Sequence, residues 1–241
     1  MYRSALLIDV GTNPDRPRPG RTWLRNAYRV HQRLCMAFPS NERRANDVAF
    51  LQPYAPEDFA PAQVHTTRSA EAGLLFRVDP LPNGRAAIIV QSAYAPDWNY
   101  AFQNVDFLAA PPVVKVYDPQ PAIDQAWRFR LRANPTKRLT AGRPGERGDG
   151  ARVQLFSDEA QRAWLARKAA ASGFALVDCR VSSSERQVSR KSQSGPAMVH
   201  QAVTFDGLLR VTAPVAFRAA LEAGIGSAKG FGFGLLSIAR G

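Results

Sequence analysis

The chain has 241 residues, of which 32 are Lys or Arg and 20 are Asp or Glu, so its formal net charge is +12. Hydrophobic residues make up 45% of the sequence, which is enough for a packed core and argues against a disordered chain. The excess of positive charge favours a polyanionic partner, with nucleic acid as the first candidate and an anionic membrane surface as the second. The sequence contains no lipidation motif that would support binding to a membrane. A basic protein without a polyanionic partner stays an alternative.

The cysteine and histidine content argues against a metal centre and a disulfide framework. There are two cysteines, Cys35 and Cys179, and three histidines, and no pair has the spacing of zinc ligands. The sequence shows no convincing carboxylate cluster, so we expect neither a metal nor another cofactor. The first residues lack a signal-peptide pattern, and no apolar run reaches the length of a membrane span. We therefore expect a cytoplasmic protein that does not bind a membrane.

The first half of the chain predicts strands and helices in the order β-α-β-β-α-β. Apolar runs predict strands at residues 4–10, 73–78, 85–91 and 113–117. Pro, Asn and Gly at 82–84 indicate a hairpin turn between the second and third strands. We expect a helix at 22–38 and a short helical or irregular segment at 97–108. Residues 40–70 are polar and broken by prolines, and no element is assigned to them.

The second half repeats this order. Strands are expected at residues 127–133, 174–181, 199–211 and 233–239. Residues 157–172 predict a helix with Ser157 as its N-cap, and residues 214–223 predict a helix opened by a proline. Residues 134–152 are rich in Gly, Arg and Pro and predict a loop. A basic, serine-rich link is expected between the second and third strands of this half.

Both halves therefore have the βαββαβ order of a ferredoxin-like domain. We predict an α+β protein of two tandem ferredoxin-like, RRM-like domains, residues 1–119 and 120–241, divided near a polar link at 118–122 that contains two prolines. Two such domains on a basic chain favour RNA, because an open sheet face suits single strands and a basic cleft suits a folded RNA. The fold serves many functions, so a double domain that binds another ligand stays an alternative.

The first predicted helix carries the most informative side chains. One stripe of this helix holds arginines four residues apart, at Arg21, Arg25, Arg29 and Arg33. Tyr28 borders this stripe, and His31 follows three residues later, so both rings can point into the same space. The pattern suggests a phosphate-binding arginine ridge beside a His–Tyr pair. The alternative is a solvated arginine face with a core histidine, and the position of His31 inside the apolar arc favours that alternative.

A His–Tyr pair beside arginines has the groups that metal-free RNA cleavage requires. The RNA's own 2′-hydroxyl must lose a proton, the 5′-oxygen must gain one, and the charge on phosphorus must be neutralised. A histidine titrates near neutral pH and suits either proton transfer. A tyrosine, whose reference pKa is near 10, is a poor base but a good donor. Nearby arginines stabilise the developing charge.

A glycine-rich segment near the C-terminus is a second candidate site. Its glycines surround Lys229 and include Gly224, Gly226, Gly230 and Gly232. Glycines allow the backbone to approach a phosphate closely, and exposed N–H groups bind it. A dinucleotide fingerprint is excluded because this segment runs from helix to strand, and a P-loop is excluded because Ser or Thr does not follow the lysine. A flexible linker stays the alternative.

Two further basic segments complete the candidate RNA surface. Strand alternation places Arg128, Arg130 and Arg132 on one face, and Lys137 and Arg138 follow. These residues suit binding along the phosphate backbone of a nucleic acid. An edge strand protected by charge is the alternative. The later link carries Arg186, Arg190 and Lys191, for which a solvated loop is the alternative.

The sequence resembles the CasE family, the pre-crRNA endoribonucleases of type I-E CRISPR systems, over nearly its whole length. The resemblance rests on LLFRVDP, IIVQS, PDW, FRLRANPTKR, WLARKAAASGF, FDGLLRVTAP and GIGSAKGFGFGLLSIAR. The family's catalytic helix carries a Tyr and a His three residues apart, and Tyr28 and His31 match them in YRVH. The resemblance therefore implies that His31 and Tyr28 are catalytic.

The resemblance also implies a tandem ferredoxin fold and metal-independent cutting at the 3′ base of a repeat hairpin, which leaves a 2′,3′-cyclic phosphate. It implies as partners the CRISPR repeat RNA hairpin, which stays bound, and other subunits of the Cascade complex, especially its backbone subunit. Two alternatives stay open: a non-catalytic subunit that holds the RNA hairpin in the same complex, and a general nucleic-acid-binding protein without hairpin preference.

Overall fold

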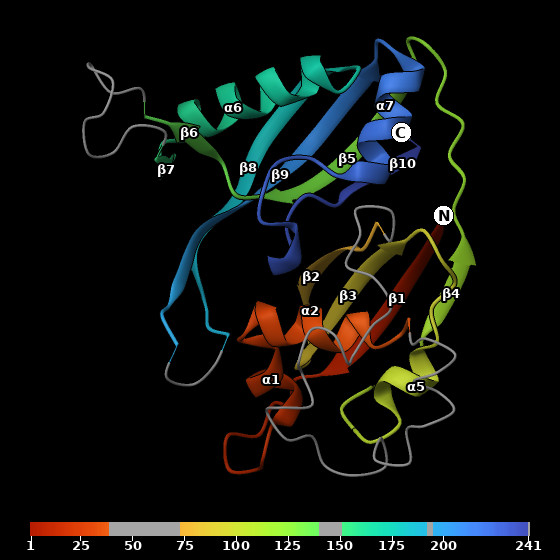
Figure 1. Cartoon of the computed structure of the whole chain (residues 1–241), viewed down its shortest axis with the longest axis vertical. Coiled ribbons are helices and arrows are strands. Elements are labelled where there is room, and N and C mark those ends of the chain that lie inside the picture. The colour runs from red at the N-terminus through yellow and green to blue at the C-terminus, as the bar shows by residue number, and fades with distance from the viewer. Residues whose placement is uncertain (39–72, 140–150, 192–194, 241) are drawn as a thin grey trace. The chain divides into compact units, whose positions relative to one another are not determined.

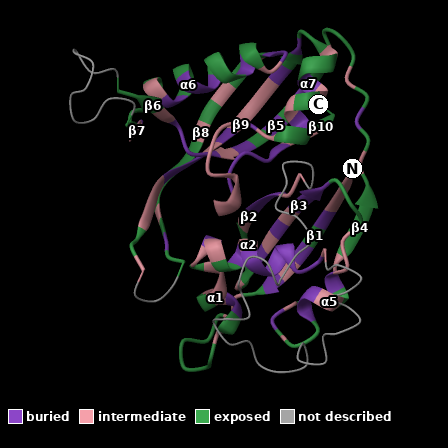
Figure 2. Cartoon of the chain, in the orientation of Figure 1, coloured by how far each residue is buried: buried purple, intermediate pink, exposed green. Residues whose placement is uncertain are grey.

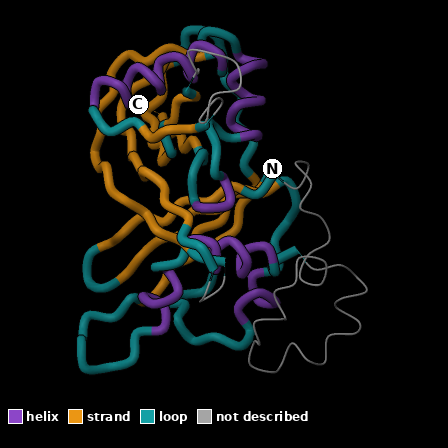
Figure 3. Tube along the Cα trace, turned by 60° about the vertical axis from the view of Figure 1, so that its left-hand side comes forward, coloured by secondary structure: helices purple, strands orange, loops and turns teal. Residues whose placement is uncertain are grey.

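The computed structural model describes residues 1–38, 73–139, 151–191 and 195–240. The chain divides into two compact units. The first comprises Met1–Asp118, Ser189–Met198 and Gly230–Gly232, and the second comprises Pro119–Val188, Val199–Lys229 and Phe233–Gly241. Each unit contains a four-stranded sheet with helices packed on it (Figures 1 and 3). Residues 40–70, for which the sequence predicts no element, lie outside the described residues.

The sheet of the first unit follows the ferredoxin-like pattern. Its strands are β1 (Tyr2–Asp9), β2 (Leu75–Leu81), β3 (Arg85–Ser92) and β4 (Val113–Val116). They lie in the order β2-β3-β1-β4, and all neighbours are antiparallel. Alternate residues of β1 are buried because successive side chains point to opposite faces. The edge strand β4 is exposed along its whole length (Figure 2).

The helices of the first unit differ from the prediction. They are α1 (Pro19–Leu24), α2 (Ala27–Cys35) and α5 (Trp98–Phe102). The single helix predicted at 22–38 is therefore wrong, because the chain breaks at Arg25 and Asn26. The side chain of Asn26 accepts a hydrogen bond from the Tyr28 backbone N–H at 3.2 Å, which caps a new helix in place of continuing the first.

The hydrophobic core of the first unit lies between the sheet and these helices. Val30 and Leu34 of α2 are fully buried against Leu6 of β1 and Phe76 of β2. Trp98 of α5 closes the same core and donates from its indole N–H to a buried serine hydroxyl of β1 at 2.9 Å. This packing fixes which face of α2 is turned away from the sheet.

The sheet of the second unit has the same topology. Its strands are β5 (Ala126–Ala133), β8 (Phe174–Ser189), β9 (Met198–Val211) and β10 (Leu236–Arg240), in the order β10-β5-β9-β8. Its helices are α6 (Asp158–Ala171) and α7 (Pro214–Ala223). The 3₁₀ turn η4 (Lys229–Phe231) begins in this unit at Lys229 and continues in the first unit. The repeated arrangement confirms the predicted α+β fold of two ferredoxin-like domains.

Two predictions for the second unit need correction. The segment predicted as a loop contains a small antiparallel ribbon of β6 (Thr136–Arg138) and β7 (Arg152–Gln154). The strand predicted at 174–181 continues to Ser189, so most of the serine-rich link is strand. Polar residues tolerate this extension because β9 supplies the backbone pairing while most of the side chains stay exposed. Residues 140–150 and 192–194 lie outside the described residues.

The core of the second unit joins both helices to the sheet. Trp164 and Leu165 of α6 pack with Phe217 of α7 against Phe129 of β5 and Phe205 of β9. Among the described residues, no helix is long and apolar enough to cross a membrane.

Candidate functional site

The start of helix α2 presents Tyr28 and His31 together. Both side chains are partly exposed, whereas Val30 and Leu34 on the other side of the helix are fully buried. The three-residue spacing puts the two rings on neighbouring positions of one face. The apolar arc suggested a core histidine, but the structure leaves His31 accessible at the margin of the core.

The His31 ring is held by contacts on several sides. It stacks on Phe76 with the ring centroids 6.3 Å apart and an angle of 13° between the planes. The thiol of Cys35, one helical turn later, lies 3.8 Å from Nδ1 and 3.7 Å from Nε2. A β-carbon built on Gly230 would lie 3.5 Å from Nε2. The imidazole is therefore positioned by the core, and residue 230, as a glycine, places no side chain against it.

Segments distant in sequence converge on Tyr28. Its ring lies 6.2 Å from that of Phe231, and the ammonium of Lys191 lies 6.0 Å from its ring centroid. The amide of Asn26 donates to the Arg190 carbonyl at 2.8 Å, which fixes the backbone beside that lysine. The sequence pattern assigned Lys191 only to a basic link and gave no signal that it reaches the Tyr28 ring.

These groups make a set with a definite chemistry. An imidazole can accept or donate a proton, a phenol can donate a hydrogen bond, and an ammonium can neutralise an anion. Among the described residues, no three or more His, Cys, Asp or Glu side chains gather closely enough to hold a metal ion.

The predicted arginine stripe is not continuous. Arg25 and Arg29 are exposed, but Arg33 is only 7% exposed. The Arg33 guanidinium donates to the Ala101 carbonyl at 2.9 Å and lies 5.8 Å from the Phe102 ring centroid. The burial of Arg33 argues against its assignment to phosphate binding, because its guanidinium donates to a carbonyl of the α5 helix within the core.

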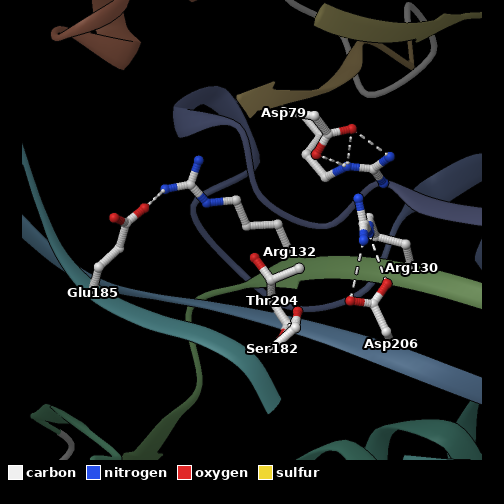
Figure 4. Close-up of polar contacts among 8 residues, drawn as sticks. Asp79, Arg130, Arg132, Ser182, Glu185, Thr204 and Asp206 are labelled. Atoms are coloured by element: carbon white, nitrogen blue, oxygen red, sulfur yellow. Dashed lines mark hydrogen bonds and ion pairs between the residues drawn. The ribbon is translucent and has the colours of Figure 1, made fainter. Parts of the chain in front are cut away.

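The arginines of β5 share one face, as the alternation predicted. Arg128 and Arg130 are exposed and Arg132 is partly exposed, while the residues between them are buried. Arg130 pairs with Asp206 at 2.7 Å, and Arg132 pairs with Glu185 at 2.8 Å (Figure 4). The edge-strand alternative is wrong, because β5 lies between β10 and β9.

The charge of Asp206 is maintained by its neighbours. Burial alone would raise the pKa of this carboxyl, but hydrogen bonds from Arg130 and Ser182, with the charge of Arg130, outweigh burial and lower that pKa. Asp206 therefore stays ionised and holds one arginine of the β5 face in a fixed orientation.

The other predicted basic residues lie on the surface. Lys137 and Arg138 of β6 and Arg186 of β8 are exposed. Arg190 is exposed and donates to the Gly195 carbonyl at 2.8 Å. Exposure leaves the cationic ends of these side chains accessible to an anion.

Residues of the glycine-rich segment belong to both units and make contacts within each. In the second unit, Gly224 is the C-cap of α7, and the Lys229 ammonium donates to the Ala223 carbonyl at the end of that helix. In the first unit, Gly232 has φ of +82°, and a β-carbon there would lie 3.2 Å from the Phe76 ring. Only glycine combines this backbone angle with so close an approach.

Comparisons with known proteins agree on one family. A family model described as "CRISPR associated protein" matches residues 1–240. The CRISPR-associated endoribonuclease Cse3 of Thermus thermophilus is 33% identical over 199 residues, which cover 74% of this chain and 90% of that protein. The Cascade subunit CasE of Escherichia coli is 29% identical over 223 residues, or 91% of this chain and 94% of that protein. A solved structure of Thermus thermophilus Cse3 bound to RNA representing a pre-cleavage complex aligns with a TM-score of 0.70 at 28% identity, covering 99% of this chain and 98% of that one.

Proposed function

The chain belongs to the CRISPR-associated protein family, and we propose that it is an endoribonuclease that cuts CRISPR precursor RNA at the 3′ base of the repeat hairpin without a metal ion. The observation that carries this proposal is the placement of Tyr28, His31 and Lys191 together on the exposed side of α2. These side chains supply proton transfer, hydrogen bonding and positive charge at one place. The similarity to an endoribonuclease named Cse3 supports RNA as the substrate.

In the proposed reaction the RNA supplies its own nucleophile. The 2′-hydroxyl loses its proton and attacks the adjacent phosphorus, while the bond from phosphorus to the 5′-oxygen breaks. The 5′-oxygen takes up a proton, so the products are a 2′,3′-cyclic phosphate and a 5′-hydroxyl. His31 acts as the general acid or base, and Tyr28 orients the 2′-hydroxyl or shares in proton transfer. Lys191 stabilises the charge on the phosphorane oxygens.

We assign the grip on the RNA to the accessible basic residues of both units. On the first unit these are Arg25, Arg29 and Arg190, and on the second they are Arg128, Arg130, Arg132, Lys137, Arg138 and Arg186. Such contacts hold phosphates and fix register without reading sequence. The division at residue 119 into a domain with the catalytic helix and a domain with the glycine-rich loop is part of this proposal.

We further propose that the protein keeps its product hairpin and works in the cytoplasm as a subunit of Cascade. A relative is named as a Cascade subunit, which supports this assignment. Retention of the product requires that the binding free energy comes from contacts with the hairpin and not from contacts at the bond that is cut. The non-catalytic holding subunit stays as the competing function.

Cleavage of the cognate repeat RNA in EDTA tests the proposal. Wild type is expected to cut, and His31→Ala and a 2′-deoxy substitution at the scissile position are each expected to abolish cutting while binding persists. Tyr28→Phe should slow cutting, and Tyr94→Phe, which changes an exposed tyrosine of the same unit, is the matched control. Binding without any cutting by wild type would identify a holding subunit. Unchanged cutting by His31→Ala would refute the catalytic assignment.

A further inference from the structure

The second unit contains a basic pocket that the proposed reaction does not use. It has a volume of about 280 Å³. Its walls come from the β6–β7 ribbon, helix α6 and the loop after α7, through Arg138, Arg152, Trp164, Lys168, Gly226 and Ser227. We call it the β6–α6 pocket. The loop was predicted to bind phosphate, whereas Arg152, Lys168 and Ser227 carried no assignment.

Three cations converge on the β6–α6 pocket. Arg138 and Arg152 are directly opposite each other in the antiparallel register of β6 and β7, and Lys168 of α6 completes the group. All three residues are exposed, and the ion pairs found among the described residues involve none of them. Like charges directly opposite on a ribbon repel each other. An anion held between them would relieve that repulsion.

The floor of the pocket is rigid. Trp164 is 4% exposed and stacks on Phe205 with the ring centroids 6.3 Å apart, so its position is fixed by the core. Lys168 lies four residues after Trp164 and therefore projects from the same face of α6. The pocket thus presents a charge on a preorganised wall, which reduces the ordering cost of binding.

A glycine keeps the pocket open on its loop side. Gly226 has φ of +86°, and a β-carbon there would lie 3.2 Å from two atoms of the Trp164 ring. This close approach sets the loop backbone directly against the tryptophan, and the next residue, Ser227, also lines the pocket. The serine hydroxyl adds a hydrogen-bond donor beside the three cations.

The size and charge of the pocket define its ligand. Pockets for complete small molecules usually measure roughly 300–1,000 Å³, so about 280 Å³ suits a small group more than a whole nucleotide. Guanidinium and ammonium groups with a hydroxyl, and no carboxylate among the described residues of the lining, match a phosphate. We propose that the β6–α6 pocket binds a phosphate group, supplied by the backbone of RNA. The RNA source rests on the proposed function, whereas the phosphate chemistry rests on the pocket alone.

Titration of RNA affinity against salt tests the pocket. The double variant Arg152→Gln/Lys168→Gln should bind the repeat hairpin about tenfold more weakly near physiological ionic strength, and the slope of log affinity against log salt should fall in magnitude by about one. Lys168→Glu should lose more affinity than Lys168→Gln, because it repels the phosphate. The matched control is Arg167→Gln, which removes an exposed charge next in sequence that does not line the pocket. Thermal melting of each variant establishes that it is folded.

The outcomes separate this proposal from the proposed function. Variants that lose affinity relative to Arg167→Gln, yet cut in EDTA at the wild-type rate when protein is saturating, support the pocket. Affinity and slope equal to those of the control overturn it, even if wild type cuts as proposed. A second arm adds inorganic phosphate to protein without RNA and follows the amide resonances of Gly226 and Ser227. Shifts with phosphate, combined with unaltered RNA affinity in the double variant, overturn the RNA source and identify a site for free phosphate.

Discussion

Gly230 leaves open the space beside the imidazole of His31, because a β-carbon at residue 230 would lie 3.5 Å from both Nε2 and Cδ2. That separation is an ordinary van der Waals contact, and Gly230 does not have a positive φ. Gly230→Ala should therefore fold and cut RNA nearly as wild type does. Gly230→Leu extends atoms into the space beside Nε2, where the RNA must approach, and should slow single-turnover cleavage at least about tenfold.

Melting temperatures of both Gly230 variants show whether the effect is local. Equal melting temperatures with slow cutting only in Gly230→Leu support an open approach to His31. Wild-type cutting by Gly230→Leu would show that the scissile group does not approach the imidazole on this side.

Arg33 should act on stability and not on RNA binding. Its guanidinium is buried and bonded to the Ala101 carbonyl. Arg33→Met removes this donor and should lower the free energy of unfolding by about 1.5–3 kcal/mol, as measured by chemical denaturation. The exposed Arg29 provides the comparison: Arg29→Met should leave stability nearly unchanged and reduce the salt dependence of RNA binding. If Arg33→Met instead left stability nearly unchanged and reduced the salt dependence of RNA binding, Arg33 would leave the core to contact RNA.

The strands were predictable because their signal is local. In β1 and β5 the alternation of apolar and polar residues reports directly which side chains face the core. The break between α1 and α2 was missed because every residue from 22 to 38 tolerates a helix. The break depends on one hydrogen bond, which the Asn26 side chain accepts from the Tyr28 backbone N–H.

The surroundings of Tyr28 were only partly predictable. The spacing between Tyr28 and His31 is a property of one helix, so the pair could be seen in the sequence. Lys191 and Phe231 reach the Tyr28 ring from more than 160 and 200 residues away. No local pattern contains such a contact, because it depends on how the whole unit folds.

Removal of the carboxylate that pairs with Arg132 should strengthen RNA binding. Arg132 donates to Glu185 at 2.8 Å, and the Glu185 side chain is 64% exposed. Exposed pairs contribute roughly 0.2–1 kcal/mol to stability, so Glu185→Gln should change the free energy of unfolding little. RNA should bind about two- to fivefold more tightly, because the arginine no longer has to leave a competing anion.

The control for Glu185→Gln is Glu222→Gln, which removes the same charge from the exposed Arg218–Glu222 pair on α7. Direct binding titrations at fixed salt compare the two variants. An equal gain in both would show that the net charge of the protein matters and not the β5 arginine.

His200 should make the protein less stable in mild acid. It lies on β9 with its ring 5.6 Å from the Phe233 ring, and burial lowers its pKa below the usual value of 6.5. As pH falls through 6.5, the unfolded chain therefore takes up a proton at His200 before the folded chain does. Proton uptake by the unfolded state alone lowers the free energy of unfolding, and this loss continues until pH reaches the lower pKa of the folded state.

Urea denaturation of wild type and His200→Gln at pH 8 and pH 5.5 isolates this contribution. Other groups titrate alike in both proteins, so the difference between them reports His200. Wild type should lose more stability than His200→Gln between pH 8 and pH 5.5, because glutamine cannot take up a proton in the unfolded chain. If both lose the same amount, the folded state protonates His200 as readily as the unfolded state, and burial on β9 does not exclude the charged imidazole.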